Sequence, residues 1–361
     1  MSRPCGAQST PEPAPPPIAR PGRVPLALLA LAIACAACAP REPYTKETFV
    51  MGTKAWVTIA GMKDDAAEQA ALAAFREMYR IETVMSNWRD SSEVSRLNRE
   101  SGRGPFTASP ELFSIIDSSL YYAGKTLGAF DVTVRPLVLL WGFEGGSAKR
   151  LPSEAELART LALVGYRKVL LNRSASTVTL PRGTEIDLAG VAKGYAVDRS
   201  IAVLKRLGVA NAFVNLGGNI FAIGSAPGRN GWPIGIRDPK GRAGAVGELL
   251  LRDQAVATSG NYENFVEIEG KRFGHLIDPR TGRPVATVLS ATVVAPTGLE
   301  SDALSTGLFV LGPEEAKAVV ASLPGVRALF AVPIDDEISY VQVGDFGARL
   351  SLADSGRLHP R

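Results

Sequence analysis

Two carboxylates and a lysine lie close together in the segment EIDLAGVAKGYAVDR at 185–199. The segment follows a strand-like stretch at 177–180, passes a glycine and continues as an expected helix. The first turn of a helix offers free N–H groups and a partial positive charge, which suit a phosphate. Lys193 would supply further positive charge, whereas Asp187 suits a ring N–H, a hydroxyl or a metal. An N-capping aspartate and a solvated lysine explain the same residues without any ligand.

A second pair of polar residues suits a cation. Asp302 and Thr306 lie four residues apart, on one face of an expected helix that Ser301 would cap. A carboxylate and a hydroxyl fit a hard cation such as Mg²⁺, with waters and a backbone carbonyl completing the coordination. An aspartate in the first helical turn and a threonine facing the core explain these residue types equally well.

The chain contains two histidines, His275 and His359. His359 lies in the expected C-terminal tail, so His275 is the histidine placed to act as a base near neutral pH. A structural histidine ahead of the turn at Asp278 is the alternative. The sequence contains no GxGxxG after a strand, no Walker A loop, no HExxH and no CxxC pair beyond residue 38. These absences count against a Rossmann oxidoreductase, a P-loop NTPase and a zinc hydrolase.

Several segments occur in the order and spacing of one known family. Together they resemble the ApbE family, the FAD:protein FMN transferases, over about residues 48–350. The segments are 51–53 (MGT), 85–88 (MSNW), 131–142 (DVTVRPLVLLWG), 185–199, 275–282 (HLIDPRTG) and 301–312 (SDALSTGLFVLG). Ala189 stands where the family often has glycine, which is a small change.

The resemblance implies roles for individual residues. It implies that Asp302, Thr306 and the backbone oxygen of Gly190 hold Mg²⁺, and that His275 is the catalytic base. Ser259, in the TSG motif at 258–260, is a further candidate for the site. The contacts to FAD implied by the resemblance fall on Met51, Trp88, Ala129, Phe130, Asp131, Asp187 and Lys193.

The implied reaction is Mg²⁺-dependent transfer of the FMN moiety of FAD to a Thr or Ser hydroxyl of an acceptor redox flavoprotein, with release of AMP. A Mg²⁺-dependent FAD diphosphatase, in which water replaces the protein hydroxyl, fits the same residues. A flavin-binding lipoprotein without chemistry is the third reading. The presence of Asp302, Thr306 and His275 weighs against that third reading.

The composition places the chain among globular proteins, because 46% of its 361 residues are hydrophobic and 21% are charged. The net charge of +4 is small, and the basic residues of the chain are not gathered in one run. Both features argue against nucleic-acid binding.

The N-terminus reads as an export signal. Residues 26–34 form an apolar run after two arginines, too short for a transmembrane helix. The sequence predicts a signal peptide over 1–37, with lipid attached to Cys38 after two alanines; Cys35 and plain secretion are the alternatives. Residues 38–47 would then be a tether, 48–350 the flavin transferase domain and 351–361 a tail. The expected location is the periplasmic face of the bacterial membrane, with the lipid as anchor.

Helical periodicity favours helices at 64–85, 110–125, 153–164, 191–207, 302–310 and 314–322. Between residues 212 and 295, strand-like stretches alternate with Gly, Pro and Asn turns. This order predicts an α+β fold with two packed subdomains, largely antiparallel sheets and flanking helices. The family resemblance implies an ApbE-like, T-fold-related architecture, and ligands favour such a seam between subdomains.

Overall fold

The computed structural model describes residues 42–144, 150–241, 244–261, 264–335, 337–352 and 358–359. Residues Arg41–Arg361 form one compact unit, and its division into two subdomains stays a prediction. The expected signal peptide, with Cys35 and Cys38, lies outside the described residues. Within the described ranges, no helix combines the length and apolar character needed to cross a bilayer.

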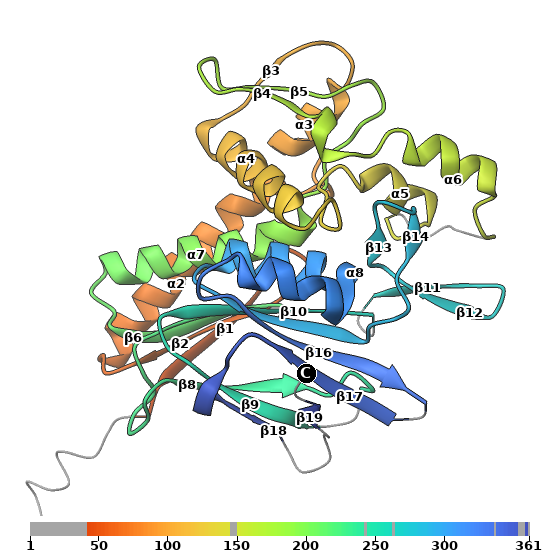
Figure 1. Cartoon of the computed structure of the whole chain (residues 1–361). Helices are drawn as coiled ribbons and strands as arrows, with labels where there is room; N and C mark the ends of the chain where they lie inside the picture. Colours follow the sequence, from red (N-terminus) through yellow and green to blue (C-terminus); the bar gives the residue numbers. More distant parts are fainter. Residues whose placement is uncertain are drawn as a thin grey trace, which may run out of the picture. The chain divides into compact units, whose positions relative to one another are not determined.

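A nine-stranded sheet is the centre of this unit (Figure 1). Its strand pairs are antiparallel except for β17 and β19, which run parallel. In spatial order the strands are β1 (Tyr44–Val50), β2 (Thr53–Ala60), β6 (Asn211–Leu216), β7 (Asn219–Ile223), β10 (Gln254–Gly260), β15 (Ser290–Ala295), β16 (Arg327–Ile334), β17 (Glu337–Val343) and β19 (Leu358–His359).

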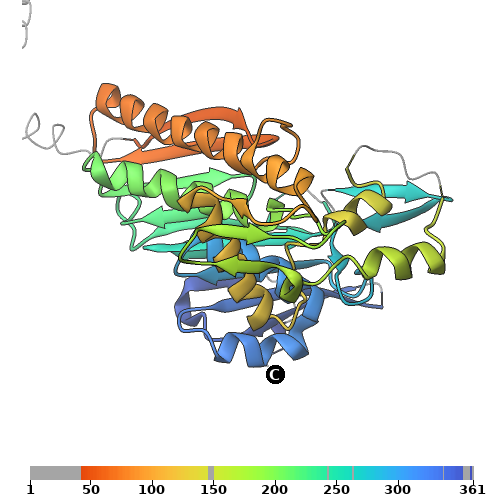
Figure 2. The same ribbon diagram turned by 90° about the horizontal axis from the view of Figure 1, so that it is seen from above.

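Three long helices cover one face of this sheet, as both views show (Figures 1 and 2). They are α2 (Asp64–Met85), α7 (Ala189–Arg206) and α8 (Gly298–Ala321). The shorter helices of the described part are α3 (Glu93–Arg99), α4 (Pro110–Lys125), α5 (Arg135–Leu140) and α6 (Glu154–Leu161).

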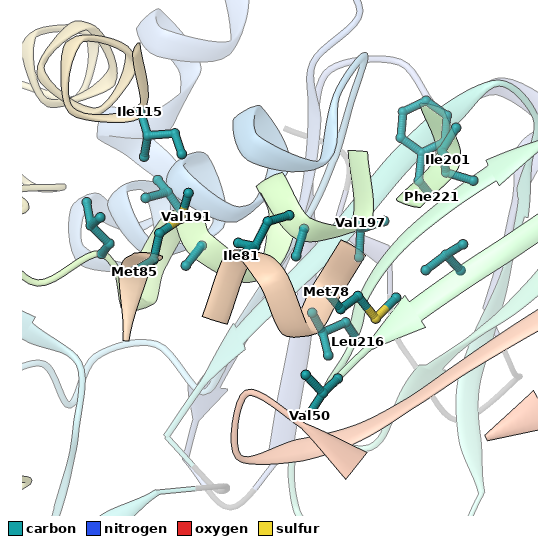
Figure 3. Packing of buried hydrophobic residues seen from close by; sticks show 14 of the residues in the cluster. Val50, Met78, Ile81, Met85, Ile115, Val191, Val197, Ile201, Leu216 and Phe221 are labelled. Carbon is teal, nitrogen blue, oxygen red and sulfur yellow. The ribbon is translucent and has the colours of Figure 1, made fainter. Parts of the chain in front are cut away.

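Apolar side chains at helical spacing explain why α2 and α7 lie on the sheet. Met78 and Ile81 of α2 are fully buried and lie among Val191 and Val197 of α7 and Leu216 of β6 (Figure 3). Burying one such side chain contributes about 1.5–3 kcal/mol. The helix layer is therefore held in place mainly by this apolar core.

A small sheet packs on the opposite face, with strands β8 (Trp232–Arg237), β9 (Ala245–Leu251) and β18 (Leu350–Leu352). Its apolar residues, such as Trp232 and Leu249, join Ile220 and Leu329 of the main sheet in a second core. The remaining small sheets are β3 (Phe106–Thr107), β5 (Thr177–Thr179) and β4 (Leu170–Asn172); β11 (Phe265–Ile268) and β12 (Lys271–Gly274); and β13 (Ile277–Asp278) and β14 (Arg283–Pro284).

The predicted α+β class with largely antiparallel sheets is confirmed. The helices expected at 64–85 and 110–125 have those bounds, and Ser153 forms the expected capping box with Glu156. Three predictions are wrong in detail. The tether was expected to reach residue 47, but β1 begins at Tyr44 and pairs along its length with β2. Ser301 does not cap α8, because Thr297 is the N-cap and accepts from the amide of Glu300. His359 was expected in a tail, but it belongs to β19.

The two helices that carry the polar motifs meet at a pair of glycines. A Cβ placed on Gly194 of α7 would lie 2.1 Å from the carbonyl oxygen of Gly298 in α8, and 2.7 Å from Cβ of Asp302. A Cβ placed on Gly298 would lie 2.3 Å from the carbonyl oxygen of Gly194. Only residues without a side chain allow these two backbones to approach so closely.

Substitution of Gly194 tests this contact. We expect Gly194→Ala to lower the free energy of unfolding by about 1–3 kcal/mol, because the added methyl meets backbone rather than a flexible side chain. Gly124→Ala in α4 is the matched control, since a Cβ there meets nothing within 4 Å. Because alanine is a better helix former than glycine, Gly124→Ala should leave the free energy of unfolding unchanged or raise it by up to about 1 kcal/mol. Urea denaturation measures the free energy of unfolding of both variants. Equal changes in the two variants would contradict the close backbone contact at Gly194.

Candidate functional site

Asp302 lies at the crossing of α7 and α8 and is 4% exposed. Its Oδ2 accepts from the backbone amide of Gly194 at 2.9 Å. In a regular helix this amide would pair with the carbonyl oxygen of Gly190, one turn earlier. Burial raises the pKa of the Asp302 carboxyl, and the positive charge of Lys193 and the Gly194 amide partly offset this rise. The carboxylate is thus desolvated but held by donors.

Thr306 lies one turn beyond Asp302 on the same helix. It is half-buried, and its hydroxyl lies 3.3 Å from Oγ of Ser259 on β10. A Cβ placed on Gly190 would lie 3.5 Å from Oγ1 of Thr306 and 3.1 Å from Cε2 of Phe130. The structure therefore brings together Gly190, Thr306, Phe130 and Ser259, which lie far apart in the sequence.

Lys193 links three titratable side chains of the site. Its Nζ donates to the carbonyl oxygen of Ala189 at 3.2 Å. Its positive charge lowers the pKa of Asp187, of Asp302 and of His275. These effects place Lys193 among the predicted flavin, cation and base residues.

Asp187 stands just before α7. Its Oδ1 accepts from the amide of Ala189 at 2.8 Å and from Nδ2 of Asn87 at 3.2 Å. Burial raises the pKa of Asp187, and the nearby carboxylate of Glu144 raises it further. The N-cap of α7 is Leu188 and has no side-chain cap, so Asp187 is not the N-cap that the alternative without a ligand expects.

His275 follows β12 and is half-buried. Its Nδ1 lies 3.1 Å from the carbonyl oxygen of Asn264. Because a carbonyl oxygen only accepts, this bond assigns the proton to Nδ1 and leaves the lone pair of Nε2 available. Burial lowers the pKa of His275 below the usual 6.5, and Lys193 acts in the same direction. The ring is therefore neutral at pH 7.

Asp131 is 5% exposed, and both of its oxygens are already in use. Oδ1 accepts from the amide and the hydroxyl of Thr133 at 2.8 and 2.6 Å, and Oδ2 accepts from the amide of Tyr166 at 2.6 Å. The carboxylate thus fixes the loop that carries Ala129 and Phe130, both of them buried. A direct contact between Asp131 and FAD stays a prediction.

Met51 and Trp88 are two further residues predicted to contact FAD. The amide of Met51, in the β1–β2 turn, donates to Oε1 of Glu82 at 3.0 Å. Trp88 is 74% exposed, so it is not the core tryptophan that the alternative reading would require. It directly follows Asn87, the partner of Asp187.

The sequence reasoning missed several polar residues that support the site. Asn98 both accepts from the amide and donates to the carbonyl oxygen of Ile186, which fixes the chain next to Asp187. Asp198 accepts from the amides of Gly298 and Leu299 and so caps α8. Burial raises the pKa of Asp198 to about 6. Isolated Asn and Asp residues gave no signal, because their partners lie about 90–100 residues away in the chain.

These oxygens fit a hard cation. A carboxylate, a hydroxyl and a carbonyl are the ligand types that Mg²⁺ prefers, and one carboxylate is sufficient when phosphates supply the remaining charge. The described ranges hold no group of three His, Cys, Asp or Glu side chains that could hold a metal ion. Two surface pockets, of about 260 and 210 Å³, lie away from these residues, one around Arg349 and one between the C-terminal end of α8 and Gln342 of β17.

Comparisons with known proteins agree with this fold. The model of the ApbE family matches residues 51–330. The FAD:protein FMN transferase of Treponema pallidum is 35% identical over 316 residues, which are 83% of this chain and 87% of the relative. The transferase of the same name from Escherichia coli K12 is 32% identical over 314 residues, covering 82% and 88% of the two chains.

Solved structures show the same architecture. The flavin transferase ApbE from Vibrio cholerae has a TM-score of 0.76 at 30% identity, covering 85% of this chain and 99% of that one. The ApbE protein of Thermotoga maritima has a TM-score of 0.74 at 33% identity, covering 81% and 94%. The fold and these relatives thus define a protein of the flavin transferase class. This chain belongs to the ApbE family.

The protonation state of His275 is directly measurable, because the chain has only two histidines. We expect its NMR resonance to titrate below 6.5, and His359→Gln to assign the two signals. Lys193→Gln should raise the pKa of His275 by removing a positive charge, yet leave it below 6.5 because burial remains the larger cause. A wild-type value at or above 6.5 would contradict the described environment.

Proposed function

We propose that this chain transfers the FMN moiety of FAD to a threonine or serine hydroxyl of an acceptor protein, with Mg²⁺ bound and with release of AMP. One observation carries the proposal. The crossing of α7 and α8 gathers Gly190, Lys193, Asp302 and Thr306, and Lys193 also acts on His275. Phosphoryl transfer requires a positive side chain that binds phosphate, a site for a metal cation and a neutral base. Lys193, the oxygens around Asp302 and His275 would supply these three parts.

The reaction balances without a further reagent. The acceptor hydroxyl oxygen attacks the phosphorus on the flavin side of the FAD pyrophosphate, forming one P–O bond. The bridging P–O bond breaks, and AMP leaves with that electron pair. The proton of the hydroxyl passes to Nε2 of His275, whose Nδ1 is already committed to Asn264.

The other residues of the chain position the substrate. Bound Mg²⁺ would supply Lewis-acid chemistry at the pyrophosphate. Lys193 and the first turn of α7 would neutralise phosphate charge. Asp187 would bind a flavin ring N–H or a ribityl hydroxyl, and the exposed indole of Trp88 would stack on an aromatic ring.

Replacing the base tests this assignment. We expect His275→Asn to bind FAD nearly as before and to transfer roughly 10²–10⁴-fold more slowly. With wild-type protein the rate should rise with pH through the lowered pKa of His275 and reach half of its maximum below pH 6.5, because only the neutral ring accepts a proton. His359→Asn is the matched control and should keep the wild-type rate.

The assay incubates the protein with FAD, Mg²⁺ and an acceptor protein of one of the named relatives. In-gel flavin fluorescence reports transfer, and free AMP reports cleavage. AMP without a fluorescent acceptor would identify a diphosphatase instead. Full transfer in EDTA would rule out the cation, and a loss of FAD affinity at an unchanged saturated rate would make His275 a binding residue.

We further propose that the protein is exported and held by lipid on Cys38 at the periplasmic face of the membrane, where its acceptor would be an extracytoplasmic redox protein. The apolar run at 26–34 and the alanines before Cys38 support this. We expect Cys38→Ser to abolish labelling by a radioactive fatty acid and to release or trap the precursor. If Cys38→Ser is labelled normally and Cys35→Ser is not labelled, the lipid is attached to Cys35 instead.

A further inference from the structure

Two arginines share one amide oxygen at the start of strand β10. Nη2 of Arg327, the first residue of β16, and Nη1 of Arg349 both donate to Oε1 of Gln254, at 2.7 and 3.2 Å. The two guanidinium groups therefore lie beside each other, although their charges repel. Burial lowers the pKa of Arg327, and the like charge of Arg349 lowers it further.

The described residues offer this pair of arginines no carboxylate partner. Neither Arg327 nor Arg349 forms an ion pair with an acidic residue of the described ranges, and Nε of Arg327 is buried without a hydrogen-bond partner. Asp345 raises the pKa of Arg327, but its Oδ1 accepts from the amide of Gly347 at 2.7 Å. Because guanidinium groups match the oxygens of carboxylates and phosphates, an anion from outside the chain would balance these charges.

A pocket of about 260 Å³ lies beside Arg349. The 3₁₀ turn η2 (Gly347–Arg349) forms one wall, and strands β9 and β18 and the turn before β8 form the others. This volume is below the roughly 300–1,000 Å³ of typical ligand pockets. The pocket therefore fits a small charged group better than a whole dinucleotide.

Hydrogen-bond donors line this pocket. Arg349 contributes a guanidinium group, and Ser351 contributes a hydroxyl. Oδ1 of Asn230 accepts from Nη1 of Arg252 at 2.7 Å, which leaves Nδ2 of Asn230 as a donor. Phosphate oxygens accept hydrogen bonds from all three kinds of group.

The pocket also contains one carboxylate, that of Glu248. Its Oε1 lies 3.4 Å from Nη1 of Arg229, a further arginine of the lining. Because Arg229 offsets the charge of Glu248, the positive charge of Arg349 is not balanced within the pocket. The pocket therefore attracts anions.

The arginine pair lies at the end of the nine-stranded sheet where β1 begins. The register pairs that lead across the sheet to it are Tyr44–Ile59, Ile59–Ala212, Ala212–Ile223, Ala222–Gln254, Ala255–Ala295 and Val294–Arg327. Ser259, in the candidate site, lies near the opposite end of β10. Residues 38–43 can span no more than roughly 20 Å even when fully extended. A lipid on Cys38 would therefore hold the start of β1, at this end of the sheet, near the membrane surface.

We propose that Arg349, supported by Arg327, Asn230 and Ser351, forms a binding site for the phosphate group of an anionic lipid headgroup. A free phosphate has the same chemistry, and the position at the anchored end of the sheet favours the lipid. The site is independent of the proposed flavin transfer, whereas the choice of a lipid rests on the proposed anchor at Cys38.

Native mass spectrometry of the full chain, released from micelles of a neutral detergent, tests this proposal. The micelles contain increasing amounts of phosphatidylglycerol, which is anionic, or of phosphatidylcholine, which has no net charge. We expect the wild-type chain to retain phosphatidylglycerol in preference to phosphatidylcholine. Arg349→Gln should weaken the binding of phosphatidylglycerol by about 10–100-fold, the range for losing a hydrogen bond between charged groups.

Two variants are matched controls. Arg173→Gln removes an exposed arginine that pairs with Asp117 on another part of the chain, and it should bind phosphatidylglycerol as the wild type does. Lys193→Gln removes the charge that would bind phosphate in the flavin site, and it should also retain the lipid. A structural role for Arg349 predicts a lower unfolding temperature in Arg349→Gln. We expect that temperature to stay at the wild-type value or rise, because Arg349 is exposed and one of two like charges is removed.

Equal retention of the two lipids by the wild type, or unchanged binding in Arg349→Gln, would overturn the proposal. Loss of the lipid in Lys193→Gln alone would place it in the flavin site and would overturn the proposal as well. If inorganic phosphate binds as tightly as phosphatidylglycerol and displaces it, the lipid assignment is wrong and the ligand is free phosphate.

Discussion

The close crossing of α7 and α8 at Gly194 is the contact on which the site depends. With no side chain at this position, the Gly194 amide reaches the Asp302 carboxylate instead of serving only its own helix. That single bond fixes α8 against the first turn of α7, where Gly190 and Lys193 lie. Thr306 then faces Gly190 and Ser259, because it is one helical turn from Asp302.

The same arrangement buries the carboxylates of the site away from water. Burial raises the pKa values of Asp302, Asp187 and Asp131, so keeping these groups ionised at neutral pH costs folding free energy. The apolar core beneath, in which α2 and α7 bury Met78, Ile81 and their neighbours, outweighs this cost. A bound cation would lower the cost at Asp302, so the site and the stability of the fold are coupled.

The sequence predicted the elements whose local signals agree with their packing. Helices α2 and α4 were placed within a residue because local start signals coincide with apolar periodicity: two aspartates form the first turn of α2, and Ser109 caps α4. The start of α8 was missed because Thr297 and Asp198 cap it, and Asp198 lies about 100 residues earlier. Strand β10 was recognised only as the TSG motif. The candidate roles of Asp187, Lys193, His275 and Asp302 were assigned from motifs, whereas Asn87 and Asn98 act through tertiary contacts that no short pattern encodes.

We expect one cation between Asp302, Thr306 and the carbonyl oxygen of Gly190, against the pyrophosphate of FAD. Crystals grown with FAD and Mn²⁺, with data collected at the manganese absorption edge, test it most directly. The account predicts an anomalous peak in contact with these three residues and with the phosphates. A strong peak elsewhere, with none at Asp302, would contradict it.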